Sequence, residues 1–322
     1  MAQVAVAIGS SHMPGLNRPV EDWFTRADSD RRRIESQGLG DYEELTRQKA
    51  SWIGPEITED RIRQRYEASQ QALLELANVF RTADVDVAVI VGDDHRELFS
   101  AQHMPAINIH SAAEVSVPPF PRDRFERFEW GATSEELDNK PYPGCIDLAE
   151  HLLGSVTKEG FDVSSSRTLG QEDIGHAFHV PCWRILQDQR VALVPVHLNT
   201  YYPPNRPTAK RCYEFGQALR RAIDSWDQEQ RVAIIGSGGL THHIIDEQMD
   251  RAILAAIENR DQEGLLAFPE DRYVDGTSEI KSWIVVAGAM ESDVRPMTLV
   301  DYQPCYRSPA GTGCANAFVY WR

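Results

Sequence analysis

Three histidines stand just after apolar segments of this 322-residue chain. The segments and their histidines are Val4–Ile8 with His12, Asp86–Gly92 with His95, and Arg231–Gly236 with His242. If the segments are strands of an open α/β sheet, the histidines lie beyond their carboxyl ends, where such sheets bind ligands. Imidazole is both a transition-metal ligand and an acid or base near neutral pH. The pattern therefore predicts a metal site or an acid–base site, although each histidine alone is more simply explained as a packed or surface residue.

The residues around these histidines fit such a site. The segment G-D-D-H-R-E gives His95 two neighbouring carboxylates, Asp93 and Asp94, and either of them could orient the ring of a metal-bound histidine. The segment S-G-G-L-T-H-H ends on His242 and His243, and its two glycines allow the backbone to approach a ligand closely. It lacks the G-K-[ST] ending of a phosphate-binding loop, which leaves a site of another kind or a plain strand-to-helix turn.

Two further residues are candidates because of their surroundings. His176 lies in D-I-G-H-A-F, and Glu279 lies in T-S-E-I-K-S-W, which predicts an N-capped helix with the glutamate in its first turn. A glutamate in a first turn is ordinarily explained by its favourable interaction with the helix dipole. The residues alone therefore leave Glu279 open between that role and a functional one.

Apolar strands alternate along the chain with segments of helical periodicity. Helices are predicted over Glu59–Asp84, Cys145–Lys158, Ala209–Trp226, Glu247–Asn259 and Ser278–Met290, a further strand over Arg190–Val196, and two closing strands over 297–302 and 317–321. The alternation predicts an α/β protein whose mainly parallel or mixed sheet is covered by helices on both faces. No linker is evident, so residues 1–322 are expected to form a single domain.

Two long stretches lack a clear period. Residues 15–58 are polar and rich in charge, and residues 117–144 carry prolines and aromatic side chains, which predicts a long loop. Long insertions of this kind often cover a functional site. Either stretch is therefore a candidate for that covering role.

Composition argues against several classes of function. A formal net charge of −16 disfavours nucleic acid as a partner, because phosphate binding needs a basic surface. No stretch reaches the ~18 apolar residues of a membrane span, and no basic region precedes Val4–Ile8 as it would in a signal peptide. The five cysteines are scattered and form no C-x-x-C pair, which favours free thiols in a reducing compartment. We therefore expect a cytoplasmic protein.

Taken together, these motifs resemble the class III extradiol dioxygenases of the protocatechuate 4,5-dioxygenase β-subunit (LigB) superfamily. Within it, the likeness is greatest to single-chain enzymes acting on gallate and 3-O-methylgallate, and it covers nearly the whole chain. The segments that carry it are S-S-H-M-P, V-I-V-G-D-D-H, I-G-H-A-F, N-T-Y-Y-P-P-N-R-P, I-G-S-G-G-L-T-H, S-E-I-K-S-W and Y-R-S-P-A-G-T-G. These enzymes share a three-layer αβα sandwich, which agrees with the predicted elements.

The resemblance implies a role for each of five residues. It implies that His12, His95 and Glu279 hold Fe(II), that His242 is the catalytic base, and that His176 is a second active-site histidine. The implied reaction is extradiol cleavage of a catecholic, carboxylated aromatic such as gallate, 3-O-methylgallate or protocatechuate, with O2 as the second substrate. A homodimer or a higher homo-oligomer is expected on the same basis.

The resemblance also implies how the substrate is held. Arg307, Ser308 and Thr312, in Y-R-S-P-A-G-T-G, are candidates to bind the ring carboxylate, since arginine can donate two parallel hydrogen bonds to such a group. The alternative is a structural Gly/Pro turn with a surface arginine. Tyr202, with Tyr201 beside it, is a candidate for the pocket lining.

Alternatives remain at two levels. His243 directly follows His242, so a shift of one residue in the comparison would exchange the two. The same set of residues also suits Zn²⁺ and its activated water, as in a zinc-dependent hydrolase or amidase. A non-enzymatic interaction protein is the second alternative, because the superfamily resemblance extends to members that lost oxygenase chemistry. The presence of all five site residues argues against it.

Overall fold

The computed structural model describes residues 1–120, 140–168 and 174–322. Its centre is a nine-stranded sheet in the order β10-β11-β1-β8-β2-β7-β3-β6, with β9 paired to β11, and a separate ladder joins β4 to β5. The strands are β1 (Gln3–Ser10), β2 (Val87–Asp93), β3 (Ile107–His110), β4 (Glu114–Val115), β5 (Tyr142–Pro143), β6 (Ser164–Ser166), β7 (Ala192–Leu198), β8 (Arg231–Ser237), β9 (His242–Ile244), β10 (Met297–Tyr306) and β11 (Thr312–Trp321).

The middle of the sheet is parallel and its flanks are mixed. β1, β8, β2 and β7 are neighbours that run in the same direction. β11 runs antiparallel to both β1 and β10, β3 runs antiparallel to β7, and β6 is parallel to β3. The predicted mixed, mainly parallel central sheet is confirmed. Its topology places the carboxyl ends of β1, β8 and β2 side by side.

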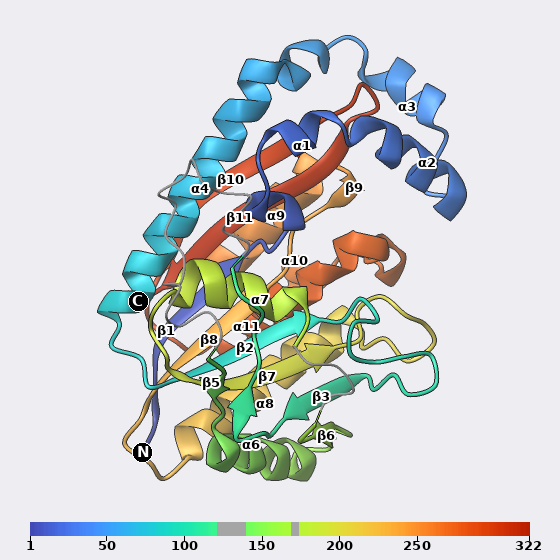
Figure 1. Ribbon diagram of the computed structural model, residues 1–322. Coiled ribbons are helices and arrows are strands. Elements are labelled where there is room, and N and C mark those ends of the chain that lie inside the picture. The colour runs from blue at the N-terminus through green and yellow to red at the C-terminus, as the bar shows by residue number, and fades with distance from the viewer. Residues whose placement is uncertain (121–139, 169–173) are drawn as a thin grey trace.

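Helices cover both faces of this sheet, as Figure 1 shows. One face carries α4 and α7, and the other carries α6, α8, α9 and α11. The helices are α1 (Glu21–Phe24), α2 (Ala27–Gln37), α3 (Tyr42–Lys49), α4 (Glu59–Thr82), α6 (Ile146–Lys158), α7 (His176–Pro181), α8 (Ala209–Ser225), α9 (Glu247–Glu258), α10 (Gln262–Leu265) and α11 (Ile280–Ala289). The predicted three-layer αβα sandwich is therefore confirmed.

Burial on both faces explains why the central strands are continuous apolar runs. In β2, Val87, Val89 and Val91 pack with the α8 and α11 layer, and Ala88 and Ile90 pack with the α4 layer. A strand that was exposed on one face would alternate apolar and polar residues instead. The same alternation holds along β8, where Val232 and Ile234 pack with the α8 and α11 layer and Ala233 and Ile235 pack with the α4 layer.

The long helices and central strands lie where the sequence predicts them, within a few residues at each end. Residues 15–58, in contrast, hold α1, α2 and α3, which were not predicted because their sequence is polar on most faces. The short elements β3, β6 and α7 were also missed. Of the predicted loop 117–144, residues 121–139 lie outside the described residues, and residues 142–143 form β5.

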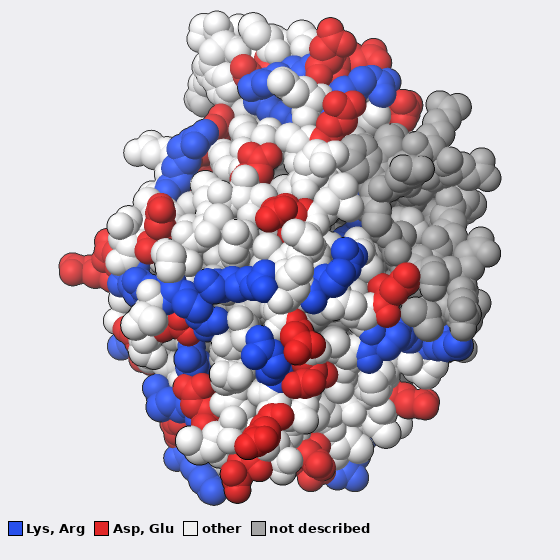
Figure 2. Space-filling view, turned by 90° about the vertical axis from the view of Figure 1, so that its left-hand side faces the viewer, with Lys and Arg blue, Asp and Glu red and all other residues white. Residues whose placement is uncertain are grey.

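The side of the molecule on which α4 lies carries both signs of charge. Figure 2 shows basic and acidic side chains interspersed there, with a short row of basic ones across the middle. The net charge of −16 is therefore not expressed as one acidic surface on this side. Of the helices that the structure describes, none is both long enough and apolar enough to cross a membrane.

Candidate metal centre and active site

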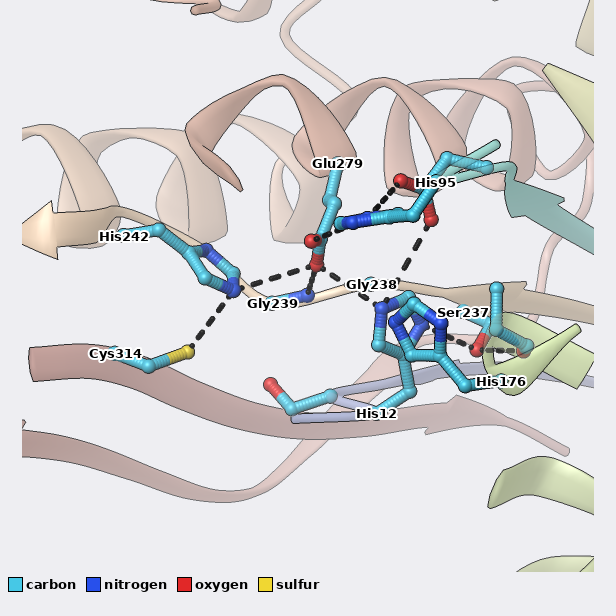
Figure 3. A network of polar contacts seen from close by, with 12 residues as sticks. His12, His95, His176, Ser237, Gly238, Gly239, His242, Glu279 and Cys314 are labelled. Carbon is cyan, nitrogen blue, oxygen red and sulfur yellow. Dashed lines mark hydrogen bonds and ion pairs between the residues drawn. The ribbon is translucent and has the colours of Figure 1, made fainter. Parts of the chain in front are cut away.

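The adjacent carboxyl ends of β1, β8 and β2 bring three of the predicted residues together. His12 lies two residues beyond β1, His95 lies two residues beyond β2, and His242 begins β9 after the loop that follows β8. Glu279 ends a 3-10 turn and occupies the N-cap position of α11, rather than the first turn that the sequence predicted. Figure 3 shows these four side chains directed toward one another.

The Glu279 carboxylate lies at the centre of this group. Its Oε2 is 3.3 Å from His12 Nε2 and 3.4 Å from His242 Nε2, and its Oε1 is 3.6 Å from His95 Nε2. Burial alone would raise the pKa of Glu279, but the surrounding histidines outweigh burial and hold this pKa well below its usual value. The carboxylate is therefore ionised and available to a cation.

Asp93, the last residue of β2, belongs to the same group. Its Oδ2 lies 2.6 Å from His95 Nε2, and its Oδ1 lies 3.9 Å from His12 Nε2. One ligand atom each of His12, Asp93 and Glu279 lie within 4.8 Å of one another, close enough for a single ion to contact them all. The sequence had suggested Asp93 only as a group that orients His95. Asp94, the other candidate for that role, instead accepts hydrogen bonds from the backbone of residues 96, 98 and 99.

Several buried polar atoms of this group contact one another as ion pairs but lack a hydrogen bond of good geometry within the described part of the chain. They are His12 Nε2, His95 Nε2 and both carboxylate oxygens of Asp93. A buried polar atom without a good hydrogen bond costs about 1–3 kcal/mol, and more when it is charged. A cation bound among these atoms would remove that cost. The donor set, two imidazoles with carboxylates, therefore fits a divalent transition metal.

A serine fixes the hydrogen of the His12 ring. Ser237 Oγ donates its single hydrogen to the carbonyl of Ala177 at 2.6 Å, so it accepts a hydrogen bond from His12 Nδ1 at 3.0 Å. In the neutral form that binds a metal, the ring therefore keeps its hydrogen on Nδ1 and leaves Nε2 as the ligand atom. Without a metal, burial would lower the pKa of His12, but the carboxylates of Glu279 and Asp93 outweigh burial and raise it. Such a partner on the far nitrogen is typical of metal-bound histidines.

His242 is electrostatically different from the other two. Its Nδ1 donates to the carbonyl of Leu240 at 2.8 Å, and its Nε2 lies 3.2 Å from Cys314 Sγ. Burial lowers the pKa of His242 in spite of the nearby Glu279, and burial raises the pKa of the Cys314 thiol. A neutral imidazole with a bare Nε2 is the form that can accept a proton.

The two glycines of S-G-G-L-T-H-H permit close packing around His242. A Cβ on Gly238 would lie 2.9 Å from Glu279 Cβ, and a Cβ on Gly239 would lie 2.2 Å from His242 Cε1. The Gly239 N–H also donates to Glu279 Oε2 at 2.8 Å. The sequence had suggested that these glycines admit a ligand; in the structure they admit the side chains of Glu279 and His242.

A buried aspartate anchors the same loop from behind. Asp250 of α9 accepts hydrogen bonds from the Thr241 N–H at 2.9 Å, from Thr241 Oγ1 at 2.8 Å and from the Tyr302 hydroxyl at 2.8 Å. The backbone N–H of His242 donates to Thr277 Oγ1 at 3.0 Å. The loop that carries His242 is therefore held by α9 and by the 3-10 turn before α11, through contacts that are not evident in the sequence.

The ring of His176 contacts the rings of both His12 and His95 edge-on. Its ring centroid is 5.0 Å from that of His12 and 4.7 Å from that of His95. Its Nδ1 and its backbone N–H both lie within hydrogen-bond distance of Glu97 Oε2, at 2.8 and 2.9 Å. Burial raises the pKa of Glu97, but His176 outweighs burial and lowers it to about 2. Sequence reasoning missed Glu97, although it shares the segment G-D-D-H-R-E with His95.

All five residues line one pocket of about 530 Å³. Other parts of the pocket wall come from α2, from the residue just before it and from Arg307. The expectation that residues 15–58 cover the site is thus consistent with where α2 lies. A cavity of similar size, about 540 Å³, between α4 and β10 has no histidine or cysteine among its lining residues.

The residues predicted to hold a substrate carboxylate are paired with a carboxylate of the chain itself. Arg307 donates to both oxygens of Asp30, Nε to Oδ2 at 2.6 Å and Nη2 to Oδ1 at 2.8 Å. Thr312 Oγ1 lies 2.7 Å from Asp30 Oδ2 and 2.6 Å from Ser308 Oγ. Ser308 and Thr312 are fully buried, and only Arg307 of the three lines the pocket. The structure therefore pairs this loop with Asp30 instead.

Tyr201, rather than the predicted Tyr202, lies on the pocket wall. The Tyr201 ring centroid is 4.3 Å from that of His95. Tyr202 is held elsewhere, because Asn199 hydrogen-bonds both its N–H and its carbonyl, and Arg96 lies 4.2 Å from its ring centre. Burial and the carboxylate of Glu279 raise the pKa of the Tyr201 hydroxyl, which therefore stays protonated.

Comparison with known proteins agrees with this geometry. Residues 63–320 match the family described as the catalytic LigB subunit of aromatic ring-opening dioxygenase. The chain is 29% identical over 197 residues to gallate dioxygenase of Pseudomonas putida, a match that covers 56% of this chain and 55% of that protein.

Two relatives of another name are similar at comparable identity. Both are named 2,3-dihydroxyphenylpropionate/2,3-dihydroxicinnamic acid 1,2-dioxygenase. That of Photorhabdus laumondii is 27% identical over 66% of this chain and 57% of its own, and that of Rhodococcus globerulus is 30% identical over 54% and 49%. The chain thus spans about half the length of the curated relatives it matches. Because the matched family covers most of the sequence, the chain belongs to the LigB family of aromatic ring-opening dioxygenases.

Proposed function

We propose that this chain is an extradiol dioxygenase that opens the ring of a carboxylated catechol. In this proposal His12, His95 and Glu279 hold Fe(II), and residues 1–322 act as one catalytic domain. The observation that carries it is the convergence of His12 Nε2 and His95 Nε2 on the Glu279 carboxylate, at 3.3 and 3.6 Å from its two oxygens. The names of the relatives support the same reaction class.

The ligand types support iron in particular. Two histidines and one carboxylate on one side of the metal leave positions open on the other, an arrangement typical of non-haem Fe(II) oxygenases. When bound, Fe(II) would supply open positions for a catechol and O2 and would allow electron density to pass between them. Asp93 adds a further negative charge beside His95, which favours a divalent cation in this buried group.

His242 is the proposed general base. Its Nδ1 hydrogen is held by the Leu240 carbonyl, and its Nε2 lies beside Glu279 in the pocket, so a catechol hydroxyl bound there would transfer its proton to Nε2. The burial that lowers the pKa of His242 keeps the ring neutral before the transfer. The protonated ring can then return the proton later in the reaction.

Two other side chains are proposed to hydrogen-bond the reactants. His176, fixed through Nδ1 by Glu97, lies against His12 and His95 and would contact substrate or oxygen from the pocket wall. The Tyr201 hydroxyl, which stays protonated, would donate a hydrogen bond on the His95 side.

The substrate class and the setting of the enzyme are also proposals. Gallate and 2,3-dihydroxyphenylpropionate, which the names of the relatives mention, both carry adjacent ring hydroxyls and a carboxylate. We propose the same class of substrate, with O2, for this chain. All five cysteines are free thiols, which supports a reducing, cytoplasmic location. A homodimer or larger homo-oligomer stays a prediction.

Metal analysis tests the ligand assignment. Protein that is reconstituted anaerobically with Fe(II) should retain about one iron per chain, and Glu279→Ala should lose it, because a buried ligand is removed. Glu67→Ala changes an exposed glutamate of α4 and serves as the matched control, which should retain iron. Full iron retention in Glu279→Ala would reject this ligand. Stoichiometric zinc in the purified protein, with amide hydrolysis and no oxygen uptake, would favour the zinc hydrolase.

A further inference from the structure

Three arginines line the same pocket as the candidate metal centre. Arg26, at the N-cap position of α2, and Arg33, within α2, both line the pocket together with Arg307. The metal-centre residues His12, His95 and Glu279 line the same cavity. A substrate that placed its ring hydroxyls at the metal centre would therefore have these arginines within the same cavity for another ring substituent.

Two of the three arginines are paired with carboxylates of the chain. Arg307 makes its two-point contact with Asp30, and Arg33 lies 3.2 Å from Asp275 Oδ1. Asp30 is further engaged by Thr312. These two guanidinium groups are therefore neutralised before any substrate arrives.

Arg26 is different from both. Among the described residues, no ion pair or hydrogen bond joins its guanidinium to a carboxylate, and the side chain is only half-exposed. Burial lowers the pKa of Arg26, and the nearby Arg307 and Arg18 lower it further, with only partial compensation by Asp30 and Asp22. A partly buried cation next to other cations is stabilised by an anion, and arginine binds a planar carboxylate through two parallel hydrogen bonds.

We propose that Arg26 binds the carboxylate of the substrate and makes the pocket selective for catechols that carry one. This inference rests on the proposed function and names a residue that determines its specificity. It assigns to Arg26 the task that the sequence assigned to Arg307, Ser308 and Thr312. In the structure Asp30 engages Arg307 and Thr312, and Thr312 in turn engages Ser308. The ring itself would lie between the metal centre and Arg26, in the cavity that Met13 and Pro14 also line.

The test compares two catechols that differ in charge. Binding of 3,4-dihydroxybenzoate and of 4-methylcatechol to the full-length, Fe(II)-loaded chain would be measured under argon, where no turnover occurs. Both compounds present the same two hydroxyls to the metal centre, so the ratio of their Kd values isolates the carboxylate. The wild type should bind the acid about 10- to 100-fold more tightly, as expected for a charge-assisted contact.

Three variants identify the residue responsible. Arg26→Gln should bring the ratio of Kd values close to unity, and Arg26→Lys should restore part of the preference, because it keeps the charge but not the two-point contact. Arg32→Gln removes the same charge from an exposed position of α2 that does not line the pocket, and it should retain the full preference. Thermal unfolding would verify that all three variants are folded.

The outcomes separate this inference from the proposed function. Equal affinities of the wild type for the two catechols, or an unchanged preference in Arg26→Gln, would overturn the role of Arg26 even in an active dioxygenase. The opposite result is an acid preference that depends on Arg26 in a protein that consumes no O2 with any catechol in air. It would support the role of Arg26 in binding the carboxylate and would rule out the proposed dioxygenase reaction.

Discussion

His242 and His243 are adjacent in the sequence, but their rings have different partners. His242 Nε2 lies 3.4 Å from Glu279 Oε2, whereas His243 Nε2 lies 3.1 Å from Asp275 Oδ2. Both side chains line the pocket, but only His242 lies next to the proposed metal ligand Glu279. Proton transfer needs a base within about 3 Å of the reacting hydroxyl, or one water away from it. On this ground the geometry favours His242 as the base over its neighbour.

The two histidines can be separated by matched variants. His242→Phe should retain iron, since His242 is not a proposed ligand, and should lose turnover by at least about 100-fold, the contribution typical of a general base. His243→Phe should keep most of its turnover. Iron content and O2 consumption of both variants are the measurements. Loss of turnover in His243→Phe, with normal turnover in His242→Phe, would assign the base to His243.

The sequence revealed those site residues whose position follows from local structure. His12, His95 and His242 were predictable because each follows an apolar strand, and the carboxyl ends of adjacent parallel strands meet. Glu279 was indicated only by the resemblance, since a glutamate near a helix start has a simpler explanation. Asp30 and Arg26 were not predictable, because their roles depend on how α2 lies against the pocket.

At the scale of elements, the loop between β8 and β9 positions His242, the proposed base. Gly238 and Gly239 allow Glu279 and His242 to approach the backbone, and Asp250 holds Thr241 from the opposite side. The sequence predicted a close approach to the backbone at these glycines, but by a ligand rather than by these two side chains. The helices of residues 15–58 were missed because no apolar face repeats there, although Trp23 is buried.

A methyl group on Gly239 should disable the base without removing the metal. It would lie 2.2 Å from His242 Cε1, so the ring must move, and a displacement of about 1 Å in a catalytic group can reduce turnover about 100-fold. Gly154→Ala is the control, since Gly154 is exposed in α6 with open space around it. We expect Gly239→Ala to lose turnover and Gly154→Ala to retain it. Unchanged turnover in Gly239→Ala would contradict the packing around His242.

At the scale of the whole molecule, one buried carboxyl group links the folding equilibrium to pH. Burial raises the pKa of Asp250 from the usual 3.8 to about 7, although Thr241 and Tyr302 donate hydrogen bonds to it. Between these two values the folded protein holds a proton that the unfolded chain has released. The stabilising contribution is therefore fully present below the unfolded pKa and is lost as pH rises toward the folded pKa.

Asp250→Asn should remove this dependence, because an amide does not titrate. The wild type should lose at most about 1.4 kcal/mol of unfolding free energy per pH unit over this range, and the variant should not. Asp227→Asn, at an exposed loop position, should behave like the wild type. The free energy of unfolding by urea, measured across the range, tests this. The same slope in Asp250→Asn as in the wild type would show that Asp250 is ionised throughout.

The central claim is that this pocket opens catechol rings with O2. The most direct test is O2 consumption by the anaerobically Fe(II)-loaded chain, across catechols with and without a carboxylate or a third ring oxygen, with ultraviolet absorbance followed in parallel. We predict that O2 is consumed in amounts equimolar with a carboxylated catechol, that absorbance changes as the ring opens, and that Glu279→Ala is inactive. Retained iron with no O2 consumption for any catechol would contradict the claim.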